Sequence, residues 1–507
     1  MSRVIKLITK LRVGVIVAAG LTVLWTAGDL RQFAQIDPNA SAAEISARLD
    51  DVLARAMEKY SIAGVAAGAI RDGEIIWSAR MGRASEEGDS VTGSTAFNVG
   101  SVSKPLTVWA VLALAQDGSI ELDAPISRYL EQFELPTGEY DLEEVTIRRL
   151  LHHTAGTNRH GYGGYGAHED QPADAVELSS VFEPLAVVRQ PGERRVYSGG
   201  GYVLLQMMIE DVTGLSFEAA LQDLVLRPLE MTDSGFALAK LPSPSAAFSY
   251  YGSTIEDLRD VALAAAGAYA SGDDMARFLL AHSTGGGVLD DSSLDAAFAP
   301  TEPNASFAMS YSRWETPFGL LIGHGGNNSA WNAQIYVRPE TQDGFYFLAN
   351  STSGAQLDFD LSCAWLSMID VQEGRDRCAE AISVTHKISW VACGVVLLSM
   401  LVFYWLLAGM ILGKRSLSIR PCSFGPIRLT LRMIVFLGVI VLLGVAVSVF
   451  YTDMLMWRTE VTLIDEMPVN EIGGLLMSTT ILLILLGAAL WSSPIKSALK
   501  RKGPVSS

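Results

Sequence analysis

At 507 residues the chain is longer than one hydrophobic core usually supports, so we expect more than one structural unit. Hydrophobic residues make up 49% of it and the mean hydropathy is +0.27, yet the formal net charge is -17. This combination excludes an entirely membrane-embedded chain and favours a mixed soluble and membrane protein, and the acidic balance argues against nucleic acid as a partner.

The first 28 residues combine a basic start with an apolar run. Four basic residues and no acidic one precede residues 13–28, which are uncharged and apolar. This pattern predicts a signal peptide or an uncleaved signal anchor over residues 1–28, so the chain that follows is expected to be exported. Residues 29–41 are predicted to form a polar linker.

The exported region opens with a predicted helix and a predicted hairpin. From Ala42 to Tyr60, apolar residues recur along one helical stripe. Two short apolar runs follow at residues 64–70 and 75–81, and the Asp-Gly pair between them is typical of a hairpin turn. We therefore expect an amphipathic helix and then two antiparallel strands.

The rest of the exported region changes from helical patterns to strand patterns and then to an amphipathic stretch. Helical patterns dominate residues 101–280, and strand patterns return at residues 332–337 and 344–348. An amphipathic stretch follows around residues 357–369. Because strands bracket a long helical insertion, we predict one α+β unit with a sheet built from both ends of the sequence.

Three apolar runs near the C-terminus are each about as long as a helix needs to cross a bilayer. They occupy residues 388–413, 433–452 and 472–495. The loop 414–432 and the tail 496–507 carry basic residues and no acidic ones, whereas the loop 453–471 carries five acids and one arginine. Because basic flanks stay in the cytoplasm, we predict three transmembrane helices, with the domain over residues 42–382 outside the cytoplasm.

The four cysteines are distributed unevenly. Cys393 falls in a predicted membrane helix and Cys422 in a predicted cytoplasmic loop, which leaves Cys363 and Cys378 in the exported region. These two either form a disulfide, which would contribute on the order of 3 kcal/mol, or remain free thiols. No residues show metal-site spacing, so we expect neither a metal nor another cofactor.

A candidate nucleophile stands at the start of the helical part. Ser101 lies four residues before Pro105, which fits only the first turn of a helix. Residues three apart share a helical face, so the Lys104 amine would lie beside the Ser101 hydroxyl, near the positive end of the helix. An activated serine requires this arrangement. The same spacing occurs twice near the basic tail, where a membrane-flanking position already explains the lysines.

Further motifs follow this one in a characteristic order. They are residues 100–105, 145–156, 191–202, 228–232, 266–277 and 323–326. In these motifs the chain resembles the serine β-lactamase and penicillin-binding-protein superfamily, in particular its class C β-lactamase-like serine hydrolases. The resemblance covers roughly residues 42–369. It implies a class C β-lactamase-like fold, in which helices flank an antiparallel sheet and a helical subdomain is inserted.

The resemblance also implies roles for three residues. Ser101 would form the acyl-enzyme, and Lys104 would share in removing its proton. The phenol of Tyr197 would act as a second general base and acid.

A second group of residues is implied to bind the substrate or its oxyanion. His324 would begin the strand at the edge of the cleft, where its imidazole would hold Tyr197 or a substrate carboxylate. Gly325 and Gly326 follow in that strand. The backbone N–H groups of Ser101 and Asn327 would form the oxyanion hole.

The chain departs from the family pattern at one position. Where relatives usually carry Tyr-Ser-Asn, it has glycine at position 199, so the side-chain amide that would bind a substrate's acylamino group is missing. Asn158, Asn327 or Asn328 could supply a replacement. For the histidine pair at residues 152–153 we favour packing or capping at a helix end over chemistry.

We therefore predict a multi-pass protein of the cytoplasmic (inner) membrane whose serine hydrolase domain faces the periplasm or the cell exterior. Its reaction would cleave amide or ester bonds through an acyl-Ser101 intermediate. D-amino-acyl peptides, β-lactam-like compounds and small esters are the expected substrates. The alternative is a catalytically idle ectodomain of the penicillin-binding type that senses a ligand and is coupled to membrane helices.

Overall fold

The computed structural model describes residues 36–369, together with Cys378 and the short segments 415–417 and 492–494. Within the first range it leaves out residues 167, 182, 183, 303, 304, 317 and 318. The chain divides into two compact units, Phe33–Asp376 and a second unit made of Met1–Gln32 with Arg377–Ser507. All of the predicted segment 1–28 and almost all of the three predicted membrane helices lie outside the described residues.

Little of the second unit is described. Strands β11 (Arg415–Leu417) and β12 (Ser492–Pro494) pair in an antiparallel manner, so the end of the third predicted membrane helix is a short strand. Across the described part of the whole chain, no helix combines the length and the apolar character needed to span a bilayer.

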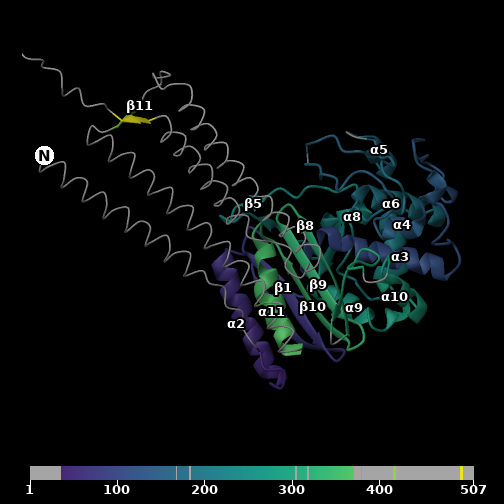
Figure 1. The fold of residues 1–507 in the computed structure, drawn as a ribbon. Helices are drawn as coiled ribbons and strands as arrows, with labels where there is room; N and C mark the ends of the chain where they lie inside the picture. Colours follow the sequence, from purple (N-terminus) through teal and green to yellow (C-terminus); the bar gives the residue numbers. More distant parts are fainter. Residues whose placement is uncertain are drawn as a thin grey trace, which may run out of the picture. The chain divides into compact units, whose positions relative to one another are not determined.

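In the first unit, helix α2 spans Ala42–Tyr60, as the apolar stripe predicts. A reciprocal capping box fixes its start, because the Ser41 hydroxyl accepts the Glu44 N–H while the Glu44 carboxylate accepts the Ser41 N–H. Its buried stripe packs against strand β2 (Glu74–Gly82) and helix α11 (Leu357–Ile369), and Figure 1 shows the two helices side by side against one face of the sheet.

A six-stranded antiparallel sheet with the order β2-β1-β10-β9-β8-β7 forms the centre of the unit. Its strands are β1 (Gly64–Arg71), β2 (Glu74–Gly82), β7 (Ser312–Thr316), β8 (Gly319–Asn328), β9 (Trp331–Arg338) and β10 (Asp343–Ala349). Strand β1 pairs with β10, with Val65 opposite Ala349, so the sheet is built from both ends of the sequence, as predicted. Asp72 and Gly73 form the predicted hairpin turn with positive φ angles of 53° and 77°.

Strand β8 corrects one prediction about the site. His324 lies in the middle of β8 and does not begin it, and β7 forms the edge of the sheet outside β8. Only the resemblance implied this strand, because glycine and asparagine, which are poor strand formers, fill most of its second half and hide the strand pattern. Its glycines allow close packing: a Cβ atom at Gly326 would lie 1.9 Å from the Val99 carbonyl oxygen.

Helix α11 corrects a second prediction. We expected an amphipathic helix, but its residues from Leu357 to Met368 are almost all buried. Contacts with β10 and with α2 enclose it, and the Trp365 ring stacks at 5.8–6.1 Å on the rings of Tyr336 and Phe345. Layers on more than one side leave this helix no solvent-facing stripe.

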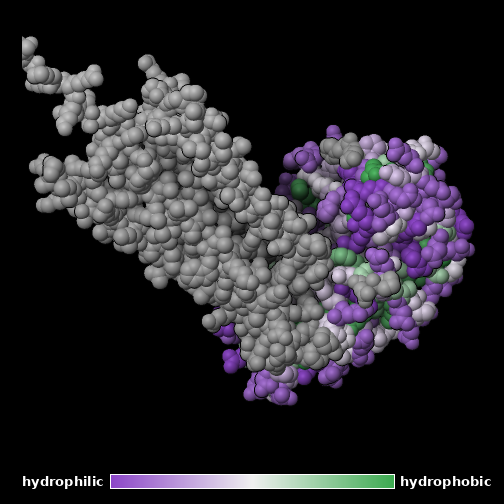
Figure 2. Space-filling model, viewed as in Figure 1, coloured by the Kyte–Doolittle hydropathy of each residue, from purple (hydrophilic) through white to green (hydrophobic). Residues whose placement is uncertain are grey.

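The helical part lies between β2 and β7 in the sequence, as predicted. Its helices are α3 (Ser103–Gln116), α4 (Ile147–Leu151), α5 (Ala175–Ser180), α6 (Gly199–Thr213), α7 (Phe217–Leu221), α8 (Leu263–Ala266), α9 (Gly272–Ala281) and α10 (Asp291–Phe298). Two small strand pairs accompany them, β3 (Ala96–Asn98) with β6 (Tyr269–Ser271) and β4 (Ala247–Phe248) with β5 (Thr254–Ile255). Helix α3 packs against α6, α8 and α10 and is almost entirely buried. Mainly hydrophilic side chains cover the face of this part shown in Figure 2.

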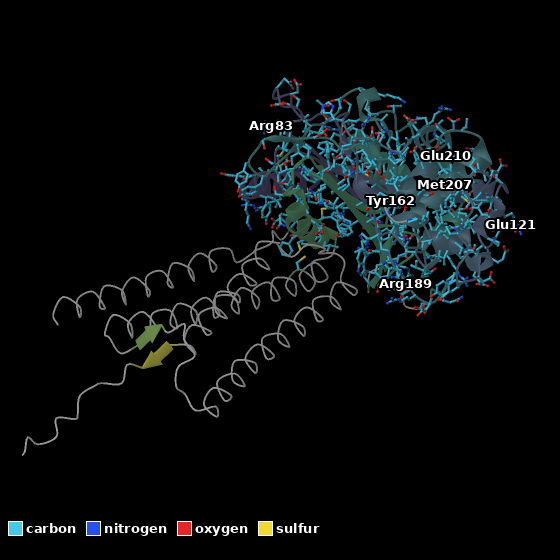
Figure 3. The ribbon with its side chains drawn as sticks, turned by 90° about the horizontal axis from the view of Figure 1, so that it is seen from above. Arg83, Glu121, Tyr162, Arg189, Met207 and Glu210 are labelled. Carbon is cyan, nitrogen blue, oxygen red and sulfur yellow. The ribbon has the colours of Figure 1, made fainter. Side chains whose placement is uncertain are left out.

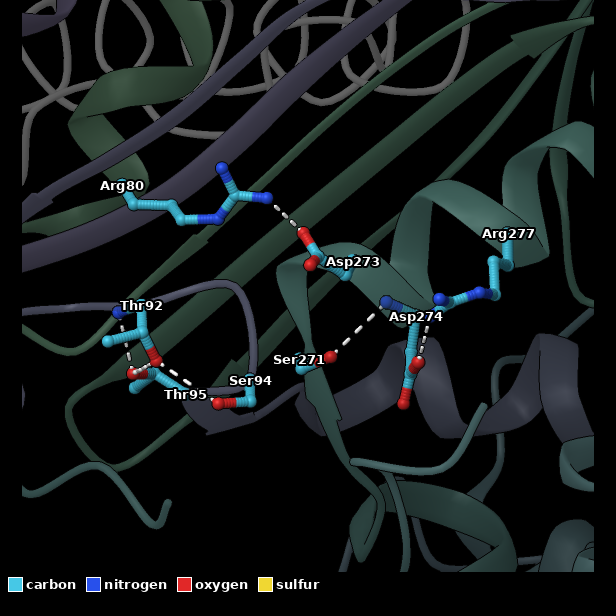
Figure 4. Close-up of polar contacts among 8 residues, drawn as sticks. All are labelled: Arg80, Thr92, Ser94, Thr95, Ser271, Asp273, Asp274 and Arg277. Atoms are coloured by element: carbon cyan, nitrogen blue, oxygen red, sulfur yellow. Dashed lines mark hydrogen bonds and ion pairs between the residues drawn. The ribbon is translucent and has the colours of Figure 1, made fainter. Parts of the chain in front are cut away.

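The start of α9 carries two acidic residues, as predicted for a helix N-terminus. Asp273 and Asp274 lie in its first turn, and the Ser271 hydroxyl caps it by accepting the Asp274 N–H (Figure 4). Asp273 also pairs with Arg80 from β2, and Asp274 with Arg277. Asp273 therefore ties the helix to the sheet, whereas Asp274 pairs within the helix.

Candidate active site

Ser101 lies in a single 3₁₀ turn, Gly100–Val102, which leads directly into α3. The Asn98 side chain stabilises this turn, because its oxygen accepts the Gly100 N–H at 2.8 Å. Gly100 has a φ of 49°, and a Cβ atom there would lie 2.7 Å from the backbone nitrogen of Asn327. Glycine at this position therefore lets the Ser101 turn come close to strand β8.

Lys104 brings its amine to the Ser101 hydroxyl, as the three-residue spacing predicts. Its Nζ lies 3.4 Å from Ser101 Oγ and donates a 2.8 Å hydrogen bond to the Ala265 carbonyl oxygen at α8. The residue is only 2% exposed. The same Nζ lies 4.6 Å from the ring centre of Tyr197, so the structure brings all three predicted catalytic residues together.

Tyr197, at the entrance to α6, is surrounded by imidazole rings. The ring centres of His153, His160 and His324 lie 4.4, 5.0 and 6.4 Å from its own. His153 follows α4 in a left-handed conformation, with φ of 60°, and its Nδ1 accepts the Ser198 N–H at 3.1 Å. The favoured packing role of this histidine therefore holds, but the residue it packs against is a candidate catalytic one.

The buried imidazoles of His153 and His324 are uncharged near neutral pH. Burial, assisted by nearby positive charge, lowers the pKa of His324 to about 3 and that of His153 well below its usual value. Lys104 and Arg195 supply that positive charge. Neutral His324 shares a 2.7 Å contact between its Nδ1 and the Gly325 carbonyl oxygen, which requires the proton on Nδ1.

That protonation state decides between the two expected uses of His324. With Nδ1 donating to a backbone oxygen, Nε2 is left as an acceptor. An acceptor suits the hydroxyl of Tyr197, whereas it repels a substrate carboxylate. This tautomer thus favours the first expected use and argues against the second.

The candidate oxyanion donors come from two segments that pack tightly. Strand β8 passes the Ser101 turn so closely that neither Gly100 nor Gly326 leaves room for a side chain. The side-chain amide of Asn327 points elsewhere, donating a 2.7 Å hydrogen bond to Asn332 Oδ1. A Cβ atom at Gly325 would lie 2.8 Å from Gln334 Oε1, so this position is also restricted.

Gly199 is covered by a segment that we call the strap, residues 158–161. The Gly199 N–H donates to the His160 carbonyl oxygen at 2.8 Å, and the Gly200 N–H donates to Arg159 at 3.1 Å. A Cβ atom at Gly199 would lie 3.0 Å from that His160 oxygen and 3.2 Å from Gly161 Cα. The strap therefore crowds the position of a side chain at residue 199 and would have to shift to admit one, and it carries the exposed imidazole of His160 to the Tyr197 ring.

The three asparagines expected to replace the missing amide are already engaged. Asn158 Nδ2 donates to the Pro184 carbonyl oxygen, Asn327 donates to Asn332, and Asn328 Nδ2 donates to Asp260 Oδ2 at 2.6 Å. This expectation is not supported, because each amide would have to leave a partner within the protein first.

The glycine-rich stretch 161–166 continues from the strap and contains two tyrosines, Tyr162 and Tyr165, that contact the rest of the domain. Tyr165 exchanges backbone hydrogen bonds with Arg259, and burial raises the pKa of Tyr162 to about 12. Figure 3 shows Tyr162 within the unit, whereas Glu121 and Arg189 lie at its outside. This stretch is therefore anchored at Tyr165 by its backbone pair with Arg259, and at Tyr162 by the Arg159 guanidinium, which lies 4.4 Å from its ring centre.

Asp260 is a residue of the site that sequence reasoning missed. It lies in the segment between β5 and α8, and desolvation raises the pKa of its carboxyl to about 7. Lys104 is one of the groups that oppose this rise. No local pattern marks the residue, because its partners are far away in the sequence. Among the described residues, no cluster of His, Cys, Asp and Glu is arranged to hold a metal ion.

Comparison with known proteins identifies related sequences. The model of a family described as Beta-lactamase matches residues 49–362. Esterase EstB of Burkholderia gladioli is 31% identical over 306 residues, which cover 52% of this chain and 77% of the esterase.

Solved structures show the same architecture. A class C beta-lactamase superimposes with a TM-score of 0.53 at 18% identity, covering 66% of this chain and 98% of that chain. The octameric penicillin-binding protein homologue from Pyrococcus abyssi gives a TM-score of 0.56 at 22% identity, covering 65% and 77%. These similarities confirm the predicted class C β-lactamase-like fold.

Proposed function

The chain belongs to the beta-lactamase family and is a serine hydrolase, and from this we propose that it cleaves its substrate through an acyl intermediate on Ser101. One observation carries the proposal. The buried Lys104 amine lies 3.4 Å from Ser101 Oγ and 4.6 Å from the Tyr197 ring centre, so one basic group serves a nucleophile and a second proton carrier.

In the proposed reaction, Ser101 Oγ attacks the substrate carbonyl carbon and gives its proton to the Lys104–Tyr197 pair. The negative charge that develops on the carbonyl oxygen is stabilised by the backbone N–H groups of Ser101 and Asn327. The leaving group takes the proton from the pair as its bond to carbon breaks. Water then repeats the sequence, releasing the acid and restoring Ser101.

The two buried histidines support the proton transfer without carrying charge. His153 fixes the backbone before α6 through its hydrogen bond from the Ser198 N–H. His324 presents Nε2 as an acceptor beside Tyr197. Neither His153 nor His324 therefore offers the phenol an imidazolium ion in competition with Lys104.

For the substrate, we propose a small ester in preference to a peptide or a β-lactam-like compound. Relatives bind an acylamino group through a side-chain amide at this position, and Gly199 has no side chain to supply one. The strap fills the space beside Gly199, and the neighbouring asparagine amides are occupied. The similarity to an esterase supports the same choice.

We further propose that the protein is anchored in the cytoplasmic membrane with this domain outside the cytoplasm. The support is the charge distribution, since three segments predicted to be cytoplasmic carry basic residues and no acidic ones. The three apolar runs between residues 388 and 495 have the length of membrane helices.

The experiment compares wild type, Ser101→Ala and the control Ser94→Ala. A serine-reactive phosphonate and a fluorescent penicillin measure acylation, and p-nitrophenyl esters and D-Ala-D-Ala peptides measure turnover. We expect wild type and the control to be labelled by the phosphonate and to hydrolyse esters, and Ser101→Ala to do neither.

Two outcomes would contradict this. Wild type that is neither labelled nor active would refute acyl transfer at Ser101. Labelling that is never followed by turnover of any substrate would favour the idle, ligand-sensing ectodomain.

A further inference from the structure

One half-buried carboxyl group, that of Asp260, lies near both backbone segments of the proposed oxyanion hole. On the side of strand β8, Asp260 Oδ2 accepts a 2.6 Å hydrogen bond from Asn328 Nδ2. Asn328 is the last residue of β8 and directly follows Asn327, whose N–H is one proposed donor. Asp260 therefore restrains the end of the strand that supplies this donor.

On the other side, the Asn98 side chain lies near the same carboxyl and holds the turn that carries the nucleophile. Its Oδ1 accepts the Gly100 N–H at 2.8 Å, immediately before Ser101, whose N–H is the other proposed donor. Its Nδ2 is buried without a hydrogen-bond partner of normal geometry among the described residues, yet it lies close enough to Asp260 to lower the pKa of that carboxyl. Asn98 is 1% exposed, so water does not compete for this amide.

We propose that ionised Asp260 is a positioning residue that keeps the Ser101 and Asn327 backbone N–H groups aligned on one oxyanion, by holding Asn98 and Asn328 together. The inference rests on the proposed function, since it concerns the same acyl transfer. A carboxylate offers an acceptor oxygen to each amide. Protonation of the carboxylate turns one of those oxygens into a hydrogen-bond donor. This donor then faces the N–H group of one amide, so the hydrogen bond on that side is lost.

The charges around Asp260 place this change within an accessible pH range. Desolvation, and then Asp257 on its own segment, raise the pKa of Asp260, whereas Asn328, Lys104 of α3 and Asn98 lower it. Tyr269 of β6 also faces this group through Asp257, to which its hydroxyl donates at 3.1 Å. With a pKa of about 7, Asp260 gains a proton as the pH falls through neutrality, and the alignment is lost in that direction.

The test measures ester hydrolysis from pH 5 to pH 9 in wild type and Asp260→Asn. The asparagine keeps the shape and one acceptor oxygen but does not ionise. We expect kcat of Asp260→Asn to be about 10-fold lower at alkaline pH with KM nearly unchanged, which is less than the loss for deleting an oxyanion donor. The fall of wild-type kcat near neutrality should disappear in this variant.

A second variant and a matched control keep the test informative if Asp260→Asn folds poorly. Asn328→Ala removes one linked amide and should lower kcat similarly, and the double variant should be no worse than the more impaired single one, because both act through one contact. The control is Asp343→Asn, another partly enclosed carboxyl with a raised pKa, which should leave the pH profile of kcat unchanged.

A wild-type pH profile in both Asp260→Asn and Asn328→Ala would overturn the inference, as would multiplicative losses in the double variant. The failure of the proposed function is distinguishable from this. If Ser101→Ala retains turnover, acyl transfer at Ser101 is wrong, whereas an inactive Ser101→Ala beside an unaffected Asp260→Asn refutes only the role of Asp260.

Discussion

At the scale of single residues, the surroundings of Tyr197 explain how the site would move protons. Lys104 Nζ lies 4.6 Å from its ring centre, nearer than the Arg195 guanidinium at 6.0 Å. The imidazoles of His153 and His324 stay neutral because burial lowers their pKa values. The phenol thus has an amine as its close charged neighbour, together with one imidazole acceptor.

Replacing the phenol tests this arrangement. We expect Tyr197→Phe to lower kcat for an ester by about 10²–10⁴-fold, the usual contribution of a general acid–base group, because the ring stays and the hydroxyl goes. The melting temperature should change little, since the contacts with His153 and Lys104 involve the ring. The control is Tyr251→Phe, at a side chain that is 92% exposed. A Tyr197→Phe enzyme within threefold of wild type would remove Tyr197 from the mechanism.

At the scale of elements, the strap and the first turn of α6 form one interlocked structure. The Ser198 hydroxyl caps α6 by accepting the Gly201 N–H and donates to backbone oxygens of Asn158 and Arg159. The Gly199 N–H adds a bond to His160. The absent asparagine at position 199 is therefore a difference in backbone packing as well as in side-chain chemistry.

Restoring the familiar residue should consequently fail to restore the familiar specificity. We expect Gly199→Asn to displace the strap and to cost about 1–3 kcal/mol of stability, as overpacking usually does, without gaining activity on acylamino substrates. Thermal unfolding and turnover of a D-amino-acyl peptide measure the two effects. Gly163→Asn, in open space within the neighbouring loop, is the control. A stable Gly199→Asn protein that gains peptide hydrolysis would show that the strap is not the obstacle.

At the scale of the whole molecule, the pairing of β1 with β10 ties the beginning of the hydrolase domain to its last described strand. Helix α11 carries Cys363, and Cys378 lies further along the chain. Each of these two cysteines is disulfide-bonded in the structure, whereas their pairing with each other stays a prediction. A bond of this kind persists in an oxidising compartment, as the proposed location requires.

Thiol titration of the unfolded protein without reductant tests both points. We expect two reactive thiols, from Cys393 and Cys422, and four after reduction. If Cys363 and Cys378 pair with each other, the double serine variant should lose about 3 kcal/mol of stability, no more than either single variant. Cys422→Ser is the control and should keep wild-type stability. Four reactive thiols before reduction would contradict both the disulfide and the oxidising compartment.

Local chemistry was enough for much of this protein. The capping serine and the apolar stripe determine where α2 forms, and the Asp-Gly pair determines the β1–β2 turn. Each of these features depends on residues that are close together in the sequence. The spacing of Ser101 and Lys104 fixed their contact for the same reason. The order of motifs then indicated the class C β-lactamase-like fold and the position of Tyr197 beside Lys104.

The tertiary structure alone decided what depends on distant neighbours. The glycine-rich strand β8 exists because β7 and β9 pair with it, and the burial of α11 follows from the layers around it. Asp260 enters the site through Asn328, 68 positions away, and its pKa depends on desolvation. Periodicity and spacing describe only adjacent turns of chain, whereas packing, burial and the electrostatics of a site arise from contacts between segments that the sequence keeps far apart.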